Sequence, residues 1–178
     1  MKSYKILVTG PFNAGKTTFI KTICGDILST DRKIGLSEAI KRSTTVALDF
    51  GTISLDDETS VRIFGTPGQR RFSFMLEPLA IGMDGYVFMV DSQDPGSLSD
   101  AAQMYRFFRE NFPNTAHVVA ANKSDAKFKI SEDVIRQVLE VSMDVPVYPT
   151  VAYDRECALS LLRLLVSLIE GKRVLTLK

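Results

Sequence analysis

The sequence is poor in the residue types from which metal centres and disulfide frameworks are built. It contains one histidine, two cysteines and no tryptophan among 178 residues. Cys24 and Cys157 lie far apart without the spacing of metal ligands, so we expect reduced thiols in a cytosolic protein. His117 opens an apolar run, which favours a structural role for this side chain.

The sequence also lacks an excess of charge of either sign and long hydrophobic runs. Lys and Arg number 22 against 21 for Asp and Glu, so we expect no nucleic-acid footprint and no acidic tail. No apolar run approaches the ~18 residues of a membrane span, and neither end carries a myristoylation or prenylation motif. These absences predict a soluble, cytoplasmic protein, and the length suits one domain over residues 1–178.

A phosphate-binding motif stands near the start of the chain. Residues 10–17 read G-P-F-N-A-G-K-T, which matches the P-loop pattern G-x-x-x-x-G-K-T. An apolar run precedes it and a helically spaced run follows, so a strand feeds a loop that opens a helix and surrounds an anion with N–H groups. We expect Lys16 to reach the β- and γ-phosphates and the Thr17 hydroxyl to bind Mg²⁺. The residues expected to bind nucleotide here are Gly10, Asn13, Ala14, Gly15, Lys16, Thr17 and Thr18.

Strand-like and helix-like patterns alternate along the rest of the chain. We expect strands at 4–9, 46–55, 61–64, 86–90, 117–121 and 145–151, and helices at 17–24, 71–79, 98–110, 131–141 and 156–170. The polar stretch 26–45 has no strand period and is interpreted as a mobile loop. The alternation predicts a doubly wound, three-layer α/β fold of the P-loop NTPase type. Its six-stranded sheet is expected to be mostly parallel, with one antiparallel strand.

A second motif predicts which base is bound. Asn122-Lys123-Ser124-Asp125 reads N-K-x-D and follows the buried strand expected to end at Ala121. An aspartate accepts hydrogen bonds from guanine N1–H and the 2-amino group together, whereas adenine has a bare lone pair at N1 and no 2-amino group. An unmatched polar pair of this kind discriminates strongly between ligands. The motif therefore favours guanine.

With these motifs, the whole chain resembles a small Ras-like GTPase. The resemblance implies that Asn122 and Asp125 hold the base of GTP or GDP and that the Lys123 stem lies against the ring. It also implies that the N–H of Ala152 meets guanine O6. Tyr153 stands where the family's S-A-K segment has its lysine, which is a departure at a weak motif.

The resemblance also implies two segments that sense the γ-phosphate. The loop 26–45 corresponds to switch I, in which Thr45 would bind Mg²⁺ in the triphosphate state. Residues 65–69 read G-T-P-G-Q and resemble the D-T-A-G-Q of switch II. There, Gly68 would bond the γ-phosphate through its N–H, and Gln69 would orient the attacking water.

Three positions depart from the family pattern. Gly65 stands where the family has the switch II aspartate that supports Mg²⁺, and Pro67 stands where the family has alanine. Phe12 stands where Ras has glycine. The G/T-x-P-G-Q form is similar to the bacterial polarity GTPases of the MglA type, which also lack the aspartate. A ring at Phe12 would crowd an arginine finger that approaches in the Ras manner.

Asp49 is a candidate replacement for the missing metal ligand. It lies four residues after Thr45, on a strand expected to pair antiparallel with the one ending at Gly65. That pairing brings its carboxylate within reach of the same Mg²⁺, and a glycine at 65 leaves room for it. The alternative is an aspartate that caps or faces solvent on an edge strand.

Arg42 is a candidate catalytic residue beside Gln69 and Lys16. It precedes Thr45 by three residues, the offset at which heterotrimeric Gα subunits carry their own arginine. The alternative is a solvated charge in a mobile loop, with Arg70 and Arg71 as rival sources of the arginine.

The function predicted is therefore a Mg²⁺-dependent switch that hydrolyses GTP to GDP. Effectors and activators would bind through switch I and through residues 65–76, which include the apolar cluster Phe72–Leu76. By resemblance to prokaryotic relatives, a Roadblock- or longin-type protein is the first candidate partner. One alternative is a GTP-binding scaffold with negligible hydrolysis. Another is a P-loop kinase or ATPase, which the N-K-x-D motif disfavours.

Overall fold

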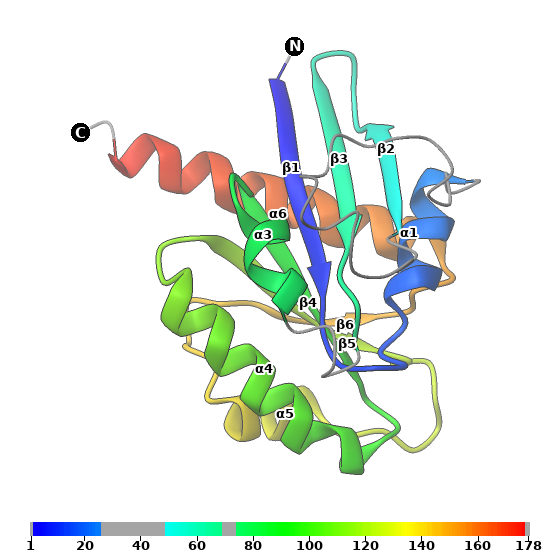
Figure 1. Cartoon of the computed structure of the whole chain (residues 1–178). Helices are drawn as coiled ribbons and strands as arrows, with labels where there is room; N and C mark the ends of the chain where they lie inside the picture. Colours follow the sequence, from blue (N-terminus) through cyan, green and yellow to red (C-terminus); the bar gives the residue numbers. More distant parts are fainter. Residues whose placement is uncertain (1, 26–48, 69–73, 177–178) are drawn as a thin grey trace.

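The structure is a computed structural model that describes residues 2–25, 49–68 and 74–176, with side chains as far as Gly171. Within these ranges six strands form one sheet in the order β2-β3-β1-β4-β5-β6 (Figure 1). β2 pairs antiparallel with β3, and every other neighbouring pair is parallel. This confirms the predicted sheet. The strands are β1 Lys2–Thr9, β2 Phe50–Ser54, β3 Thr59–Gly65, β4 Gly85–Asp91, β5 Ala116–Asn122 and β6 Val147–Thr150.

Helices cover both faces of the sheet, which gives three layers. They are α1 Lys16–Cys24, α3 Leu76–Ala80, α4 Leu98–Asn111, α5 Glu132–Leu139 and α6 Arg155–Thr176, with a 3₁₀ turn η2 at Pro95–Ser97. α1 and α6 pack on one face, and α3, α4 and α5 pack on the other (Figure 1). Successive side chains of a strand point to opposite faces of the sheet. Val87 and Met89 of β4 therefore pack in the core on the side of α1 and α6, whereas Tyr86 and Phe88 pack on the side of α3, α4 and α5.

Most elements differ from their predicted bounds by a few residues, and two of these differences have an identifiable reason. The helix expected at 71–79 is α3, which begins at Leu76, and residues 69–73 lie outside the described ranges. Pro78 is the third residue of α3, where a missing N–H costs no intrahelical bond. β6 is shorter than the expected 145–151 and carries Pro149, which is tolerated because β6 is an edge strand.

The parallel strands bring the sequence motifs to one edge of the sheet. The P-loop follows β1, residues 66–68 follow β3, the N-K-x-D motif starts at the end of β5, and residues 151–153 follow β6. In the register Asp91 lies beside Asn122, and Asn122 lies beside Thr150. Ligands of doubly wound sheets bind at this carboxyl edge.

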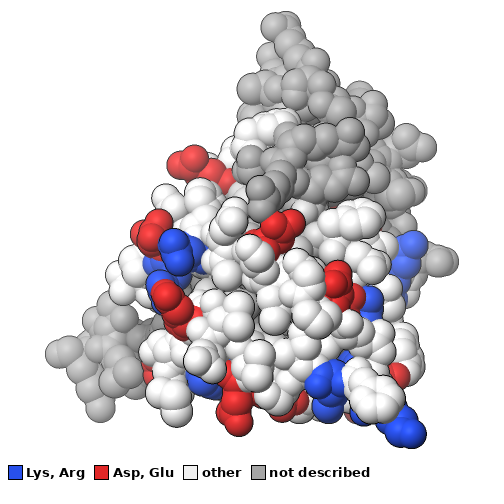
Figure 2. All heavy atoms as spheres, turned by 90° about the horizontal axis from the view of Figure 1, so that it is seen from below, with Lys and Arg blue, Asp and Glu red and all other residues white. Residues whose placement is uncertain are grey.

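Charges of both signs are interspersed on the face toward which β1 points. Figure 2 looks onto that face from below, and its coloured Lys, Arg, Asp and Glu side chains alternate without gathering into one block on the described part. Attraction for a phosphate at this edge must therefore come from local groups more than from a broad basic surface. Among the helices that the structure describes, none has the length and apolar character needed to cross a membrane.

Candidate nucleotide-binding site

The loop between β1 and α1 is a tight cradle whose shape depends on two glycines. Gly10 and Gly15 have φ angles of +138° and +98°, a region that residues with side chains rarely adopt. A Cβ atom on Gly10 would lie 2.2 Å from the carbonyl oxygen of Met89, and one on Gly15 would lie 2.2 Å from Nδ2 of Asn122. The loop therefore packs directly against the ends of β4 and β5. Because Gly15 caps α1 without a side chain, the first N–H groups of the helix remain donors for an anion.

Lys16 is the buried cation of this cradle, with 8% of its surface exposed. Its Nζ donates to the carbonyl oxygens of Gly10, at 2.8 Å, and of Pro11, at 2.6 Å. Burial lowers the pKa of Lys16 to about 8, and the negative charge of Asp49 acts in the opposite direction. A buried ammonium held by neutral carbonyls gains from an anionic partner. The placement thus suits the phosphate contact expected of Lys16.

The remaining loop residues expected to bind nucleotide surround this lysine. Ala14 is buried, whereas Asn13, Thr17 and Thr18 are exposed. Asn13 has a φ of 64°, so the loop turns sharply at this residue as well.

Asp49 contacts Thr17, the residue expected to bind Mg²⁺. The Thr17 hydroxyl donates to Oδ2 of Asp49 at 2.5 Å, and the N–H of Gly65 donates to the Asp49 carbonyl at 2.8 Å. A Cβ atom on Gly65 would lie 3.1 Å from Cβ of Asp49 and 3.5 Å from its Oδ2. The Asp49 carboxylate thus lies directly beside position 65. A hydroxyl and a carboxylate side by side are the oxygen ligands that suit Mg²⁺.

Asn122 joins three loops through its side-chain amide. Its Nδ2 donates to the carbonyl of Ala14 at 2.9 Å, and its Oδ1 accepts from the N–H of Ala152 at 2.9 Å. The residue is buried, so both bonds are shielded from water. Asn122 therefore acts as a brace between the P-loop and the loop after β6. The Ala152 N–H expected to meet guanine O6 is the one that Asn122 binds, so a base contact would have to share it.

Lys123 is held by an aspartate that sequence reasoning did not identify. Its Nζ donates to Oδ2 of Asp91 at 2.5 Å, and Asp91 is buried at the end of β4. Lys123 has a φ of 62°, so the backbone adopts a left-handed conformation directly after β5. In the sequence, Asp91 is a single acidic residue at the end of a continuous apolar run, and this feature is the signal that identifies it.

The residues after β3 lie against the P-loop. The Thr66 hydroxyl donates to Oγ1 of Thr9 at 2.9 Å, and both side chains are buried. A Cβ atom on Gly68 would lie 2.6 Å from Nζ of Lys16 and 2.7 Å from the backbone nitrogen of Phe12. The described part of this segment thus touches the same lysine that is expected to hold phosphate. Three predicted site residues, Arg42, Thr45 and Gln69, lie outside the described residues, as do Arg70 and Arg71.

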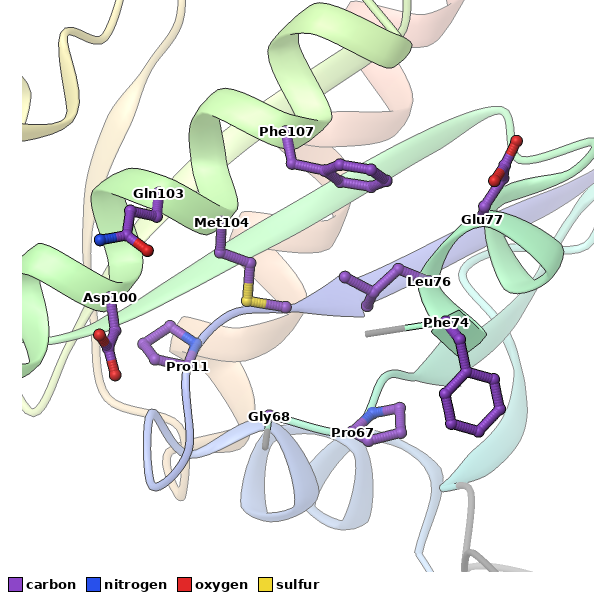
Figure 3. Close-up of a pocket in the computed structure, with 10 residues that line it drawn as sticks. All are labelled: Pro11, Pro67, Gly68, Phe74, Leu76, Glu77, Asp100, Gln103, Met104 and Phe107. Atoms are coloured by element: carbon purple, nitrogen blue, oxygen red, sulfur yellow. The ribbon is translucent and has the colours of Figure 1, made fainter. Parts of the chain in front are cut away.

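A cavity of about 500 Å³ lies beside this contact, between the P-loop, α3 and α4. Figure 3 shows Met104 and Phe107 of α4 facing Leu76 of α3 across it. Of the expected apolar cluster at 72–76, Met75 and Leu76 are buried, whereas Phe74 is 55% exposed. The sequence did not single out the α4 residues, because helical spacing gives core and cavity positions the same pattern. The lining residues are Pro11, Pro67, Gly68, Phe74, Leu76, Glu77, Asp100, Gln103, Met104 and Phe107.

The fold and the site together define a small Ras-like P-loop GTPase. Residues 1–171 match the family model described as the elongation factor Tu GTP binding domain. The chain therefore belongs to this family of GTP-binding domains.

Relatives agree with this assignment. The ADP-ribosylation factor-like protein 3 of Saccharomyces cerevisiae is 26% identical over 139 residues, which cover 77% of this chain and 68% of that protein. An uncharacterised protein of Methanocaldococcus jannaschii is 33% identical over 88 residues, 49% of this chain, and the match spans only 51% of that protein's length.

A solved structure shares the fold. The Arl6 BBS3 small GTPase of Trypanosoma brucei, which holds the nucleotide analogue GppNp, has a TM-score of 0.74 and 16% sequence identity, covering 96% of this chain and 99% of that one. The likeness to MglA-type GTPases at residues 65–69 is untested by these comparisons and stays a prediction.

Proposed function

We propose that the protein is a guanine-nucleotide switch that binds GTP and GDP with Mg²⁺ and hydrolyses GTP. The observation that carries the proposal is the bracing of the P-loop, the N-K-x-D motif and the loop after β6 by one buried side chain, Asn122. This bracing would keep the phosphate cradle and the start of the N-K-x-D motif in one fixed relation.

Nucleotide competition tests base choice. GTP and GDP should displace a fluorescent GDP from the protein, and ATP and ADP should not, because adenine lacks the donors that Asp125 accepts. Equal displacement by ATP and GTP would exclude a guanine switch.

The phosphates would be held by N–H groups of residues 10–18 and by Lys16. A Mg²⁺ ion would be held by Thr17, Thr45 and Asp49 and would neutralise charge on the β- and γ-phosphates. The contact between Thr17 and Asp49 supports this assignment, because it gathers two hard oxygen ligands next to the cradle. Gly65 supports it as well, since it leaves the space that the Asp49 carboxylate uses.

Hydrolysis would be an in-line attack by water on the γ-phosphorus, with GDP leaving. Gln69 would orient that water, and Lys16 would stabilise the charge that builds on the phosphate oxygens. Arg42 would add the further cation from within the chain. Phe12 favours an internal source, because its ring is 67% exposed on the loop that an arginine from an activator would have to pass.

Partners would bind the triphosphate form through switch I and through residues 65–76. Gly68 supports this coupling because it touches Lys16 and also lines the same cavity as Phe74. A change at the γ-phosphate would therefore act on the lining of a cavity that includes the exposed side chain of Phe74. A Roadblock- or longin-type protein is the first partner to test.

A GTP-binding scaffold with negligible hydrolysis is the second candidate. Gly65 favours it, because the aspartate that relatives place there is missing. Single-turnover hydrolysis, with and without a partner, separates the scaffold from the switch.

A further inference from the structure

The hydroxyl of Tyr153 donates a hydrogen bond to Oδ2 of Asp125, the carboxylate expected to read guanine. Tyr153 is 66% exposed, and Asp125 is exposed as well. The same contact raises the pKa of Tyr153, because its hydroxyl is the donor to a negative charge. A tyrosine thus supports the carboxylate from the position where relatives carry the lysine of the S-A-K segment.

The backbone on both sides of this contact is held in place. Asp154 donates its N–H to the carbonyl of Val151 at 2.9 Å, which closes a turn around Tyr153. On the other side, the N–H and the hydroxyl of Ser124 both donate to the carbonyl of Thr150, at 3.1 and 3.0 Å. Tyr153 therefore lies in a turn that is held by hydrogen bonds, so its hydroxyl can reach Asp125 without further ordering of the backbone.

We propose that Tyr153 is a positioning residue for guanine recognition, which fixes the orientation of the Asp125 carboxylate through its hydroxyl. This inference rests on the proposed guanine-nucleotide function and adds a specificity-determining residue to it. Guanine presents two donors that must meet both carboxylate oxygens in one plane. An exposed carboxylate rotates freely, and fixing it before the ligand arrives removes part of the cost of binding.

If Tyr153 acts through the Asp125 carboxylate, the effect of its hydroxyl on affinity depends on which base is bound. Each carboxylate oxygen has more than one acceptor site, so Oδ2 can keep the tyrosine hydroxyl and still accept from guanine. The hypoxanthine base of inosine diphosphate (IDP) lacks the 2-amino group and offers Asp125 a single donor. One donor can be met by either oxygen of a rotating carboxylate. GDP therefore needs the fixed orientation more than IDP does.

The test measures dissociation constants for GDP and IDP by competition against fluorescent GDP. Tyr153→Phe removes the hydroxyl and keeps the ring, and Tyr148→Phe on β6 is the matched control. Tyr153→Phe should weaken GDP by about threefold or more and IDP by much less, so that the preference for GDP over IDP falls. Tyr148→Phe should leave both constants unchanged.

A double-mutant cycle tests whether the effect passes through Asp125. In an Asp125→Asn background, Tyr153→Phe should add little further loss of GDP affinity. Equal weakening of GDP and IDP, no weakening, or tighter GDP binding by Tyr153→Phe would each overturn the positioning role. A parent protein that binds ADP as well as GDP would instead overturn the guanine switch itself, so the two failures are distinct.

Discussion

The hydroxyl of Thr17 donates to Oδ2 of Asp49 at 2.5 Å, although the two residues are 32 positions apart in the sequence. The contact exists because Asp49 directly precedes β2, which pairs antiparallel with β3. The Asp49 carbonyl accepts from Gly65, the residue at the end of β3. The carboxylate beside position 65 therefore comes from the segment that precedes β2, and position 65 itself is a glycine.

The first prediction concerns this carboxylate. Asp49→Ala should speed GDP release about tenfold or more and should weaken the dependence of release on Mg²⁺, because the variant lacks the carboxylate that we propose as a metal ligand. Asp57→Ala, in the turn between β2 and β3, is the matched control and should release GDP at the parent rate. The measurement is the loss of fluorescent GDP across a Mg²⁺ titration. Release rates of Asp49→Ala that equal the parent's throughout the titration would leave Asp49 a structural residue.

The second prediction concerns the brace at Asn122. Asn122→Ala leaves the carbonyl of Ala14 and the N–H of Ala152 without their buried partner, which should lower the free energy of unfolding by about 2–4 kcal/mol. Asn111→Ala, which removes an exposed bond to Phe107 at the end of α4, should change it by less than about 0.5 kcal/mol. Urea unfolding without added nucleotide measures both. Similar losses in the two variants would contradict the bracing role.

The sequence was sufficient for those parts of the site that depend on local patterns. The P-loop and the N-K-x-D motif are contiguous, and each follows an apolar strand, so the parallel sheet places both at one edge. The expectation that Gly65 leaves room beside Asp49 depended on the antiparallel pairing of β2 with β3. The register of that pairing decides which residues lie opposite each other.

The parts that could not be predicted depend on contacts between distant side chains. Asp91 meets Lys123 across two strands, and Tyr153 meets Asp125 across two loops. Neither pair has a spacing that distinguishes it from solvent-exposed charges. Met104 and Phe107 likewise have the helical spacing of core residues, and only the position of α3 decides that they line a cavity.

The third prediction concerns the source of the catalytic arginine. An arginine within the chain typically supports turnover of about 10⁻² per second, against about 10⁻⁴ without one. Arg42→Ala should therefore slow hydrolysis by at least about tenfold, or ~1.4 kcal/mol in the barrier, with GDP affinity nearly unchanged. Arg70→Ala and Arg71→Ala are the comparison variants. Hydrolysis by Arg42→Ala at the parent rate, alone and with a partner, would assign the arginine elsewhere.

The fourth prediction concerns partner binding. Phe74→Ala should reduce capture of a Roadblock- or longin-type protein by the GTP-loaded form, because it removes an exposed ring that lines the same cavity as Gly68. Phe128→Ala, which removes a still more exposed ring in the loop after the N-K-x-D motif, should have no effect. Binding measured against both nucleotide states provides the comparison. Equal capture of the partner by GDP- and GTP-loaded protein would indicate a static scaffold.

The most direct test of the switch is the release of γ-phosphate from GTP by the purified protein in a single turnover. We expect Mg²⁺-dependent release of phosphate from GTP, leaving bound GDP, and no comparable release from ATP. No phosphate release from GTP, either alone or with a partner that binds the GTP form, would contradict hydrolysis and leave a GTP-binding scaffold. Release from ATP as fast as from GTP would contradict the guanine switch altogether.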